Sequence, residues 1–277
     1  TGSGELARWV AARFPSARSV ANAANLGFAR ALRAGIEAAR HGLVLAMNPD
    51  ILVREGFLEP LVAALGDPEV HSAVPRILLF GDPERVESIV EIAFERDLAY
   101  VRQRGLEGQA RRFSGVLPVN YAIGGALLVR RDEFLAGGGF DPLYEPFYYE
   151  DVDLGFAAWR AGRRVLWVGD SVVEHHHRGT IRRRVDEGLV RAVIERNRLL
   201  FQWKFVEGEE AVERELEALY RLAIDAYLRD EREELVWLAL ALDRLQELEA
   251  SRRALPRAAR SFAAVIEESS PLGDGPA

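Results

Sequence analysis

Leu43-Val44-Leu45-Ala46-Met47 runs directly into Asn48-Pro49-Asp50, and this segment indicates the fold class. Five consecutive apolar residues stopped by turn residues predict a short buried strand. A carboxylate at the carboxyl end of a parallel strand lies where open α/β sheets bind ligands, and it can hold Mg²⁺ or Mn²⁺ against a phosphate. Because Asn, Pro and Asp are also the commonest turn residues, a plain turn at Asp50 is the alternative.

Helices and strands are expected to alternate on both sides of this strand. The helical segments are 4–14, 28–40, 56–65 and 150–161, and the extended segments are 19–21, 70–79, 121–129 and 164–173. This alternation is typical of a parallel sheet covered by helices on both faces, so the expected class is α/β. The irregular, charged segment 80–116 is expected to be a connecting excursion.

The composition changes near residue 184, where glycine and proline give way to Ala, Leu, Glu and Arg. We therefore expect one domain over residues 1–184 and a helical region over 185–277 with three or four helices. Trp237 lies in a run, LVWLALAL, that is apolar around most of a helix. Because Glu rather than Lys or Arg dominates its surroundings, this run favours packing or homo-oligomer formation over membrane binding.

The composition excludes several classes of protein. The 277 residues carry 36 Lys and Arg against 43 Asp and Glu, a formal charge of −7 that argues against binding to nucleic acid. The chain has no cysteine, so disulfides, Cys-ligated metals and a thiol nucleophile are excluded. Its longest apolar run, 235–242, is too short to cross a bilayer. We expect a cytoplasmic protein, either free or peripheral on the inner face of the membrane.

An acidic cluster enters the helix expected at 150–161. Glu150, Asp151 and Asp153 provide three carboxylates within four residues. Acidic residues in a first turn complement the helix dipole, so capping is one interpretation. Three carboxylates exceed what a cap requires, and the aromatic approach through Phe147 would raise the pKa of a carboxylate toward the range of a general base.

Histidine and glycine form two further clusters. His175, His176 and His177 are consecutive, and on an extended segment at most two of them can face one site, so one is the candidate metal ligand and a solvated loop is the alternative. Gly124-Gly125 interrupts an expected strand, which indicates close approach of a ligand or another backbone. Neither this pair nor the glycines at 137–139 have the spacing of a dinucleotide or ATP phosphate loop.

Six short motifs occur together in one order. They are Asn25-Leu26-Gly27-Phe28-Ala29, Asn48-Pro49-Asp50, Gly124-Gly125-Ala126, Gly139-Phe140-Asp141, Tyr149-Glu150-Asp151-Val152-Asp153 and His175. In this order the chain resembles, over roughly residues 1 to 205, the family 2 inverting glycosyltransferases, particularly the rhamnosyltransferase-like and galactofuranosyltransferase-like branch. The resemblance implies the GT-A fold, a Rossmann-like mixed sheet, for the first domain.

The resemblance also implies a role for each motif. Asp50 and His175 would bind a divalent metal, Mg²⁺ or Mn²⁺, with His176 as the alternative ligand, and Asp151 would be the catalytic base. The residues implied in donor or acceptor binding are Asn25, Gly27, Arg30, Asn48, Gly124, Gly125, Glu150 and Asp153. Asn48 departs from the more usual aspartate of the family and would contact the nucleotide sugar as a neutral group.

The implied activity is metal-dependent, inverting transfer of a sugar from a nucleoside diphosphate to a hydroxyl of a glycan or lipid-linked acceptor, as in polysaccharide biosynthesis. The alternatives are a non-catalytic glycan- or nucleotide-binding module on the same fold and a sugar-nucleotide nucleotidyltransferase. The basic stretch 178–184 either grips a diphosphate or forms a solvated face.

The chain begins at Thr1, and its single methionine is Met47. Compared with the family, it is expected to lack a strand–helix–strand unit of roughly 30 to 45 residues that holds the nucleobase. The fragment is therefore expected to bind donor poorly unless those strands are supplied.

Overall fold

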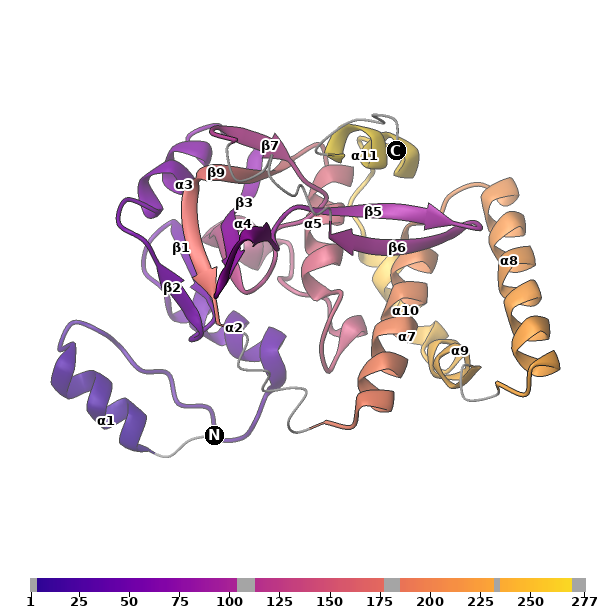
Figure 1. The fold of residues 1–277 in the computed structure, drawn as a ribbon, viewed down its shortest axis with the longest axis horizontal. Coiled ribbons are helices and arrows are strands. Elements are labelled where there is room, and N and C mark those ends of the chain that lie inside the picture. Colours follow the sequence, from indigo (N-terminus) through magenta and orange to yellow (C-terminus); the bar gives the residue numbers. More distant parts are fainter. Residues whose placement is uncertain (1–3, 104–112, 177–184, 232–234, 271–277) are drawn as a thin grey trace.

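A computed structural model describes residues 4–103, 113–176, 185–231 and 235–270. Within them a mixed sheet forms one half of the molecule and a group of helices forms the other (Figure 1). The strands are β1 Leu43–Met47, β2 Ile51–Val53, β3 Val70–Leu79, β4 Asp82–Val86, β5 Val90–Glu95, β6 Leu98–Gln103, β7 Val116–Pro118, β8 Ala126–Arg130 and β9 Arg164–His175. The helices before residue 184 are α1 Gly4–Arg13, α2 Gly27–Ala38, α3 Leu58–Ala64, α4 Arg131–Ala136, the short 3₁₀ helix η1 Pro142–Tyr144, and α5 Glu150–Arg160.

The main sheet has the order β1-β8-β3-β9-β2, with β4 beside β3 and β7 beside β9. β8 runs antiparallel to both β1 and β3, whereas β3 and β9 are parallel. β1, β3 and β9 therefore share one direction, and their carboxyl ends meet at one edge. The mixed sheet implied by the resemblance is therefore confirmed, whereas the parallel sheet suggested by the alternation alone is not, because β2, β4, β7 and β8 each pair antiparallel with a neighbour.

Two segments differ from the sequence expectations. The stretch 80–116 is not an irregular excursion throughout, because β4 extends the main sheet and β5 pairs with β6 as a separate antiparallel hairpin. The expected strand at 19–21 does not form, and only the second half of 121–129 joins the sheet, as β8. These strands are not predicted from sequence because β4 and the ends of β5 and β6 carry charged residues. The alternation of apolar residues in them is too short to indicate a strand.

The second half contains α7 Glu187–Phe205, α8 Glu209–Leu228, α9 Val236–Leu242, α10 Leu245–Ala254 and α11 Phe262–Ser269. The described part of the chain thus has more helices here than the three or four expected. Phe201 and Phe205 of α7 pack on Phe156 of α5, and Phe262 of α11 closes the same aromatic cluster. This core fastens the helical region to the sheet half through α5.

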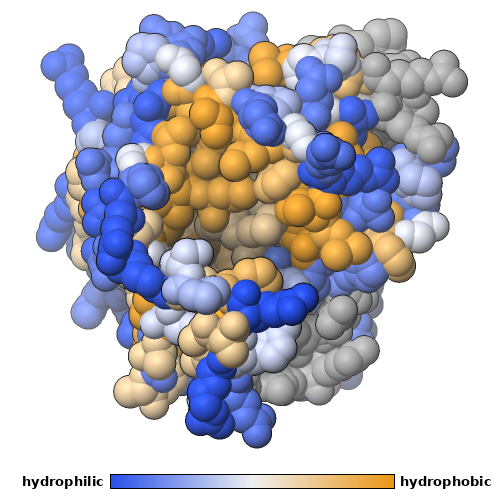
Figure 2. All heavy atoms as spheres, turned by 90° about the vertical axis from the view of Figure 1, so that its left-hand side faces the viewer, coloured by the Kyte–Doolittle hydropathy of each residue, from blue (hydrophilic) through white to orange (hydrophobic). Residues whose placement is uncertain are grey.

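An apolar face lies on the side of the molecule that carries α1, β2 and α3. Figure 2 shows apolar side chains gathered around a hollow there. The exposed large apolar residues of β1, β2 and α3 are Met47, Leu52, Val53, Leu58 and Val62. Among the described strands β1 pairs with β8 alone, so the other side of β1 has no described partner strand. No helix within the described residues is long and apolar enough to cross a membrane.

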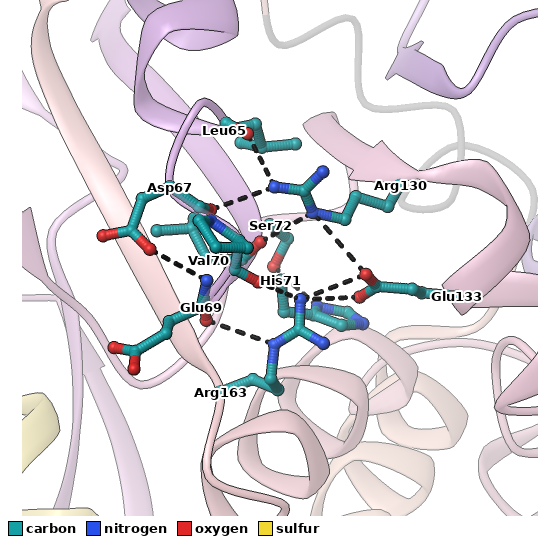
Figure 3. Close-up of polar contacts among 10 residues, drawn as sticks. Leu65, Asp67, Glu69, Val70, His71, Ser72, Arg130, Glu133 and Arg163 are labelled. Carbon is teal, nitrogen blue, oxygen red and sulfur yellow. Dashed lines mark hydrogen bonds and ion pairs between the residues drawn. The ribbon is translucent and has the colours of Figure 1, made fainter.

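Two arginines clamp the end of the sheet farthest from the carboxyl ends of β1, β3 and β9 (Figure 3). Arg130 donates to the carbonyl oxygens of Leu65, Asp67 and Val70 at 2.6 to 3.1 Å. Arg163 reaches the carbonyl oxygens of Pro68 and Glu69 and forms an ion pair with Glu133 at 2.9 Å. The clamp fixes the turn between α3 and β3 by adding side-chain donors to its carbonyl oxygens.

The clamp encloses His71, and this makes the stability of the fold sensitive to acid. His71 is buried beside Ser72, and burial is the main reason that its pKa falls to about 4. Glu133 opposes the shift, while Arg163 and Arg130 add to it. Between the unfolded pKa of 6.5 and about 4, the unfolded chain binds a proton that the folded chain does not, so stability falls as the pH falls through this window.

We therefore expect the free energy of unfolding to drop by on the order of 3 kcal/mol between pH 7.5 and 4 through this group. The measurement is urea denaturation across this range, comparing the wild type with His71→Gln. The variant should have a flatter acid limb, and His41→Gln, at an exposed histidine, should keep the wild-type slope. An unchanged slope in His71→Gln would contradict this origin of the acid sensitivity.

Candidate active site

Asp50 and His175 lie side by side at the edge where β1, β3 and β9 end. Asp50 follows β1, and His175 is the last residue of β9. The short strand β2 pairs with β9 so that Ile51 lies opposite His175, and the amide of His176 donates to the carbonyl of Asp50 at 2.8 Å. Asp50 Oδ1 and His175 Nε2 are 3.5 Å apart. The backbone pairing of two strands therefore fixes the separation of these two side chains.

A third residue, Glu87, contacts His175 from the other side. Its Oε2 lies 3.2 Å from His175 Nδ1, and its side chain is buried just after β4. The hydrogen bond with Glu87 is the largest cause of a raised pKa at His175, with burial opposing it and Asp50 adding to it. Glu87 is not among the residues predicted from sequence, because it lies in the segment interpreted as an excursion. A glutamate after a short strand carries no local signal of this role.

The structure distinguishes among the consecutive histidines. The ring of His176 stacks on Phe80 with ring centroids 3.3 Å apart. Its buried Nε2 has no hydrogen-bond partner among the described residues. His175, not His176, faces Asp50. His177 and the basic stretch 178–184 lie outside the described residues.

Asp151 lies in the first turn of α5 and contacts the glycine pair that precedes β8. Its Oδ2 accepts a hydrogen bond from the amide of Gly124, and its Oδ1 accepts one from Val152, both at 2.9 Å. Burial raises the pKa of Asp151 while these hydrogen bonds oppose the shift. Burial also raises the pKa of the neighbouring Glu150, and the charge of Asp151 adds to that shift. Two adjacent acids are thus held in a low-dielectric setting at the start of one helix.

The glycine pair Gly124-Gly125 lies between the turn after β1 and the start of α5. A Cβ atom at Gly125 would lie 3.2 Å from Asn48 Nδ2, and one at Gly124 would lie 3.1 Å from Phe28 and 3.6 Å from Asp151 Oδ2. The backbone N–H of Asn48 donates a hydrogen bond to the carbonyl oxygen of Gly125 at 2.8 Å. Larger residues at these positions would therefore push apart the turn after β1 and the start of α5. Asn48 and Asp151 consequently border the same glycine pair.

The residues at the start of α2 face the loop that precedes α5. Asn25 Oδ1 accepts a hydrogen bond from the amide of Gly27 at 3.1 Å, and Gly27 has φ +76°, which a side chain would strain. Arg30 forms an ion pair with Glu145. The start of α2 is thereby joined to residues 145–146, close in sequence to Glu150 and Asp151.

Asn197 of α7 holds this loop, although no local sequence pattern indicates such a role. Its Nδ2 lies 2.8 to 3.0 Å from the carbonyl oxygens of Tyr144, Phe147 and Tyr148. Arg196 donates to Asn197 Oδ1 at 2.7 and 2.9 Å, which fixes the orientation of the amide. Tyr148 and its neighbour Tyr149 have φ of 67° and 76°, a strained conformation for non-glycine residues. We infer that Asn197 maintains the turn that orients the acids of α5.

Replacement of Asn197 by Asp should therefore damage both the fold and the site. The variant is nearly isosteric, but it exchanges the donating amide for an oxygen that faces three carbonyls. We expect a loss of roughly 1 to 3 kcal/mol in the free energy of unfolding, measured by urea denaturation. Asn22→Asp, at an exposed position, is the matched control and should be neutral. Wild-type stability in Asn197→Asp would show that the amide does not hold the loop.

Asp153 differs from its expected role in ligand binding. It is buried, accepts a hydrogen bond from the hydroxyl of Tyr144 at 2.8 Å, and forms an ion pair with Lys204 at 2.7 Å. Lys204 also binds Asp141 at 2.8 Å, so the lysine bridges two carboxylates inside the protein. Asp153 and Asp151 are two residues apart on a helix and therefore point in different directions. The structure gives Asp153 a role in joining α5 to α7.

A mixed sheet flanked by helices, with acids after β1 and at the start of α5, is the arrangement of the GT-A fold. GalNAc-T7, solved with UDP, GalNAc and Mn²⁺, has this fold: it superposes with a TM-score of 0.59 at 18% identity over 73% of this chain and 39% of its own. Residues 2–134 match the model of Glycosyl transferase family 2. The match supports the expected family over residues 2–134, and the superposition confirms the expected fold.

Two curated relatives from Mycobacterium tuberculosis match part of the chain. The N-acetylglucosaminyl-diphospho-decaprenol L-rhamnosyltransferase is 30% identical over 192 residues, 59% of this chain and 60% of the relative. The pre-mycofactocin glycosyltransferase is 29% identical over 160 residues, 56% of this chain and 31% of the relative. The chain thus spans less than two thirds of the length of either relative.

Proposed function

We propose that the chain transfers a sugar, with inversion, from a nucleoside-diphosphate donor to an acceptor hydroxyl, using a divalent metal. The observation that carries this proposal is that the Asp50–His175 pair follows the turn in which Asn48 contacts Gly125, while Asp151 contacts the adjoining Gly124. The family 2 match supports the reaction class. A glycine backbone lets a sugar lie close to the chain, and Asp151 is held beside it.

The side chains at this edge fit a divalent metal. Asp50 offers a carboxylate oxygen and His175 an imidazole nitrogen, and their 3.5 Å separation lets them share one ion. Hard divalent cations such as Mg²⁺ and Mn²⁺ prefer oxygen ligands and keep positions for waters and substrate phosphates. No cluster of three or more His, Asp or Glu able to hold a metal occurs among the described residues, so donor oxygens and water would complete the coordination. When bound, the metal would neutralise charge on the departing nucleoside diphosphate.

Glu87 would orient His175 toward this ion. A ligating imidazole usually gives its second ring nitrogen to a carboxylate or carbonyl, which fixes its tautomer and orientation. The 3.2 Å contact between Glu87 Oε2 and His175 Nδ1 matches this arrangement and leaves Nε2 facing Asp50. Glu87 is thus a positioning residue in the proposal.

Asp151 would act as the base. As the acceptor oxygen attacks the anomeric carbon, its proton passes to the Asp151 carboxylate, a carbon–oxygen bond forms, and the bond to the diphosphate oxygen breaks. A single displacement of this kind inverts the anomeric centre. The amides of Gly124 and Val152 hold the carboxylate in place, and its raised pKa brings it nearer to that of an effective base at neutral pH.

The proposed acceptor is a sugar hydroxyl on a glycan or lipid-linked diphosphate. One relative is named for L-rhamnosyl transfer to N-acetylglucosaminyl-diphospho-decaprenol, which supports placing this pair first among the substrates to be tested. For this chain we propose only the substrate classes. The donor is a nucleotide of a hexose or deoxyhexose, and the acceptor is a sugar on a lipid diphosphate.

The test is release of nucleoside diphosphate from a panel of sugar nucleotides with Mn²⁺, with and without a prenyl-diphosphate N-acetylglucosamine acceptor. We expect acceptor-stimulated release with at least one donor and a product of inverted anomeric configuration by NMR. Donor binding without release across the panel would favour a non-catalytic binding module and contradict the proposal. Formation of sugar nucleotide from a sugar phosphate would favour a nucleotidyltransferase.

A further inference from the structure

Three arginine side chains from different elements converge on Glu145, in the loop that precedes the acids of α5. Arg30 of α2 pairs with its carboxylate, and the distance from Nη2 to Oε2 is 2.6 Å. Arg196 of α7 donates to its carbonyl oxygen at 2.6 Å. Arg244, which directly precedes α10, reaches the same carbonyl oxygen at 3.5 Å. We call Arg30, Arg196 and Arg244 the arginine cluster.

The arginine cluster carries more positive charge than the carboxylates around it neutralise. Among the described residues, the carboxylate within hydrogen-bond distance of the cluster is that of Glu145, and it pairs with Arg30. A second carboxylate, on Glu247, lies 3.9 Å from Arg244 Nε, beyond hydrogen-bond distance. The chain as a whole has 43 acidic residues against 36 Lys and Arg, so this local excess is opposite in sign to the composition.

Arg244 has donor groups that the protein leaves largely unused. Its Nε is buried and has no hydrogen-bond partner among the described residues. Its two terminal nitrogens lie 3.5 Å from the carbonyl oxygens of Glu145 and Pro142, longer than the roughly 2.7 to 3.2 Å of usual N–H···O hydrogen bonds. A buried donor without an acceptor costs free energy, and a bound anion would remove this cost. Because 23% of the side chain is exposed, a ligand can reach it.

Arg196 and Arg244 are like charges held close together. Arg196 is buried, and burial is the main cause that lowers its pKa to about 10, with the charge of Arg244 adding to the shift. Buried charges are usually paired with a charge of opposite sign. Arg196 instead donates to uncharged oxygens, the carbonyl of Glu145 and the side-chain amide of Asn197. An anion beside Arg244 would therefore stabilise both guanidinium groups.

Contacts connect the arginine cluster to the proposed base. Arg30 lies two residues after Phe28 at the start of α2. Phe28 lies 3.1 Å from the position that a Cβ atom at Gly124 would take, and the amide of Gly124 donates to Asp151 Oδ2. Glu145 lies only six residues before Asp151 in the sequence. An acceptor that presents its hydroxyl to Asp151 therefore has the cluster nearby for the rest of its structure.

We propose that the arginine cluster binds the diphosphate of a lipid-linked acceptor sugar, through Arg244 and Arg30. This inference rests on the proposed glycosyl transfer, in which the metal holds the diphosphate of the donor and the acceptor approaches Asp151. Guanidinium groups suit this ligand because their planar fork donates two parallel hydrogen bonds to phosphate oxygens. Arg30, with 60% of its side chain exposed, would exchange the carboxylate of Glu145 for the phosphate. Arg196 is a positioning residue, since its donors already hold the loop.

Calorimetric titration without metal tests the site separately from the transfer reaction. The full chain in EDTA is titrated with geranyl-diphosphate N-acetylglucosamine and with geranyl N-acetylglucosaminide, which lacks the diphosphate. We expect the diphosphate ligand to bind at least about tenfold more tightly, as for hydrogen bonds to a charged group. Its binding should weaken between about 50 and 500 mM NaCl, because salt screens the charges, while binding of the uncharged ligand should not.

Two variants test the arginines directly. Arg244→Gln and Arg30→Gln should each weaken binding of the diphosphate ligand by roughly 10- to 100-fold and leave binding of the uncharged ligand unchanged. Arg253→Gln is the matched control, because Arg253 lies in the last turn of α10 and pairs with Glu249. Circular dichroism establishes that each variant folds.

Glu145→Gln separates ligand binding from a purely structural role of the cluster. The carboxylate of Glu145 competes with the ligand for Arg30, so its removal should tighten binding of the diphosphate ligand by up to about fivefold, the contribution of an exposed ion pair. If the cluster only held the loop in place, loss of this ion pair would weaken binding or leave it unchanged. Either of these results would overturn the proposal.

Two further results would overturn it. One is equal binding of the two geranyl ligands by the wild type, or a loss in Arg244→Gln no larger than in Arg253→Gln. The other is Arg244-dependent binding of uridine or thymidine diphosphate in EDTA that excludes the acceptor, which would assign the cluster to the donor. These titrations involve no turnover, so a chain that binds the diphosphate ligand through Arg244 but transfers no sugar would contradict the proposed function alone.

Discussion

Replacement of Asp151 by Asn is expected to reduce the turnover number by ~10² to 10⁴ while binding of the donor is retained. The variant removes the carboxylate that would accept the proton of the acceptor hydroxyl. The amide oxygen can still accept one of the two backbone hydrogen bonds, from Gly124 or from Val152, that hold Asp151. Because asparagine is nearly isosteric with aspartate, the substitution leaves the shape of the site at Gly124-Gly125 unchanged. A loss of rate would therefore report on proton transfer. The measurement is single-turnover kinetics together with calorimetric titration of the donor.

Glu150→Gln is the matched control for this variant. It changes the neighbouring acid in the same way but leaves the contact between Asp151 and Gly124 untouched. We expect a smaller loss of turnover, because the amide of Gly124 contacts Asp151 and the raised pKa of Glu150 results mainly from burial. If Glu150→Gln abolished turnover while Asp151→Asn kept most of it, the two acids would exchange roles and the assignment of the base would be wrong.

Replacement of Asp50 by Asn is expected to weaken binding of Mn²⁺ by more than the ~10- to 100-fold that follows loss of an outer partner of a metal ligand. The carboxylate is the anionic ligand of the proposed pair, and a neutral amide supplies no charge to hold the ion. Electron paramagnetic resonance of free Mn²⁺ gives the affinity directly, without reference to turnover. His175→Ala should produce a loss of similar size, because it removes the other ligand.

Two further histidine-site variants make this test specific. His176→Ala should leave the affinity for Mn²⁺ within a few-fold of the wild type, since the ring of His176 packs on Phe80 and does not face Asp50. Glu87→Gln should cost ~10- to 100-fold through the orientation of His175. Wild-type affinity in both Asp50→Asn and His175→Ala would exclude a metal at this edge.

Much of the arrangement at the sheet edge could be expected from local sequence. An apolar run that ends in turn residues, a glycine pair before a strand and an acidic helix start are local patterns. β1 and β9 share a direction and β8 runs against them, so the end of β1, the end of β9 and the start of β8 meet. Asp50 and His175 therefore lie at the end of the sheet that Gly124 precedes, although more than 50 residues separate each from the next in the sequence.

The remaining residues could not be predicted because their contacts are long-range. Glu87 meets His175 only after β4 has joined β3 and brought residue 87 across the sheet. Asn197 lies in the middle of a helix, where an asparagine normally faces solvent, and its three carbonyl partners lie about 50 residues earlier. Asp153 was grouped with Asp151 by sequence, but the helix period turns it toward Lys204 in the interior.

The central claim is that one edge of the sheet holds both the donor's metal and the catalytic base. Crystals of the protein soaked with Mn²⁺ and a sugar nucleotide test it most directly, because Mn²⁺ has an anomalous signal that lighter atoms lack. We predict a single strong anomalous peak bonded to Asp50 and His175, with the diphosphate on the ion and the anomeric carbon over Gly124-Gly125, open to an acceptor on the side of Asp151. A sugar nucleotide bound elsewhere, or a peak that touches neither Asp50 nor His175, would contradict the account.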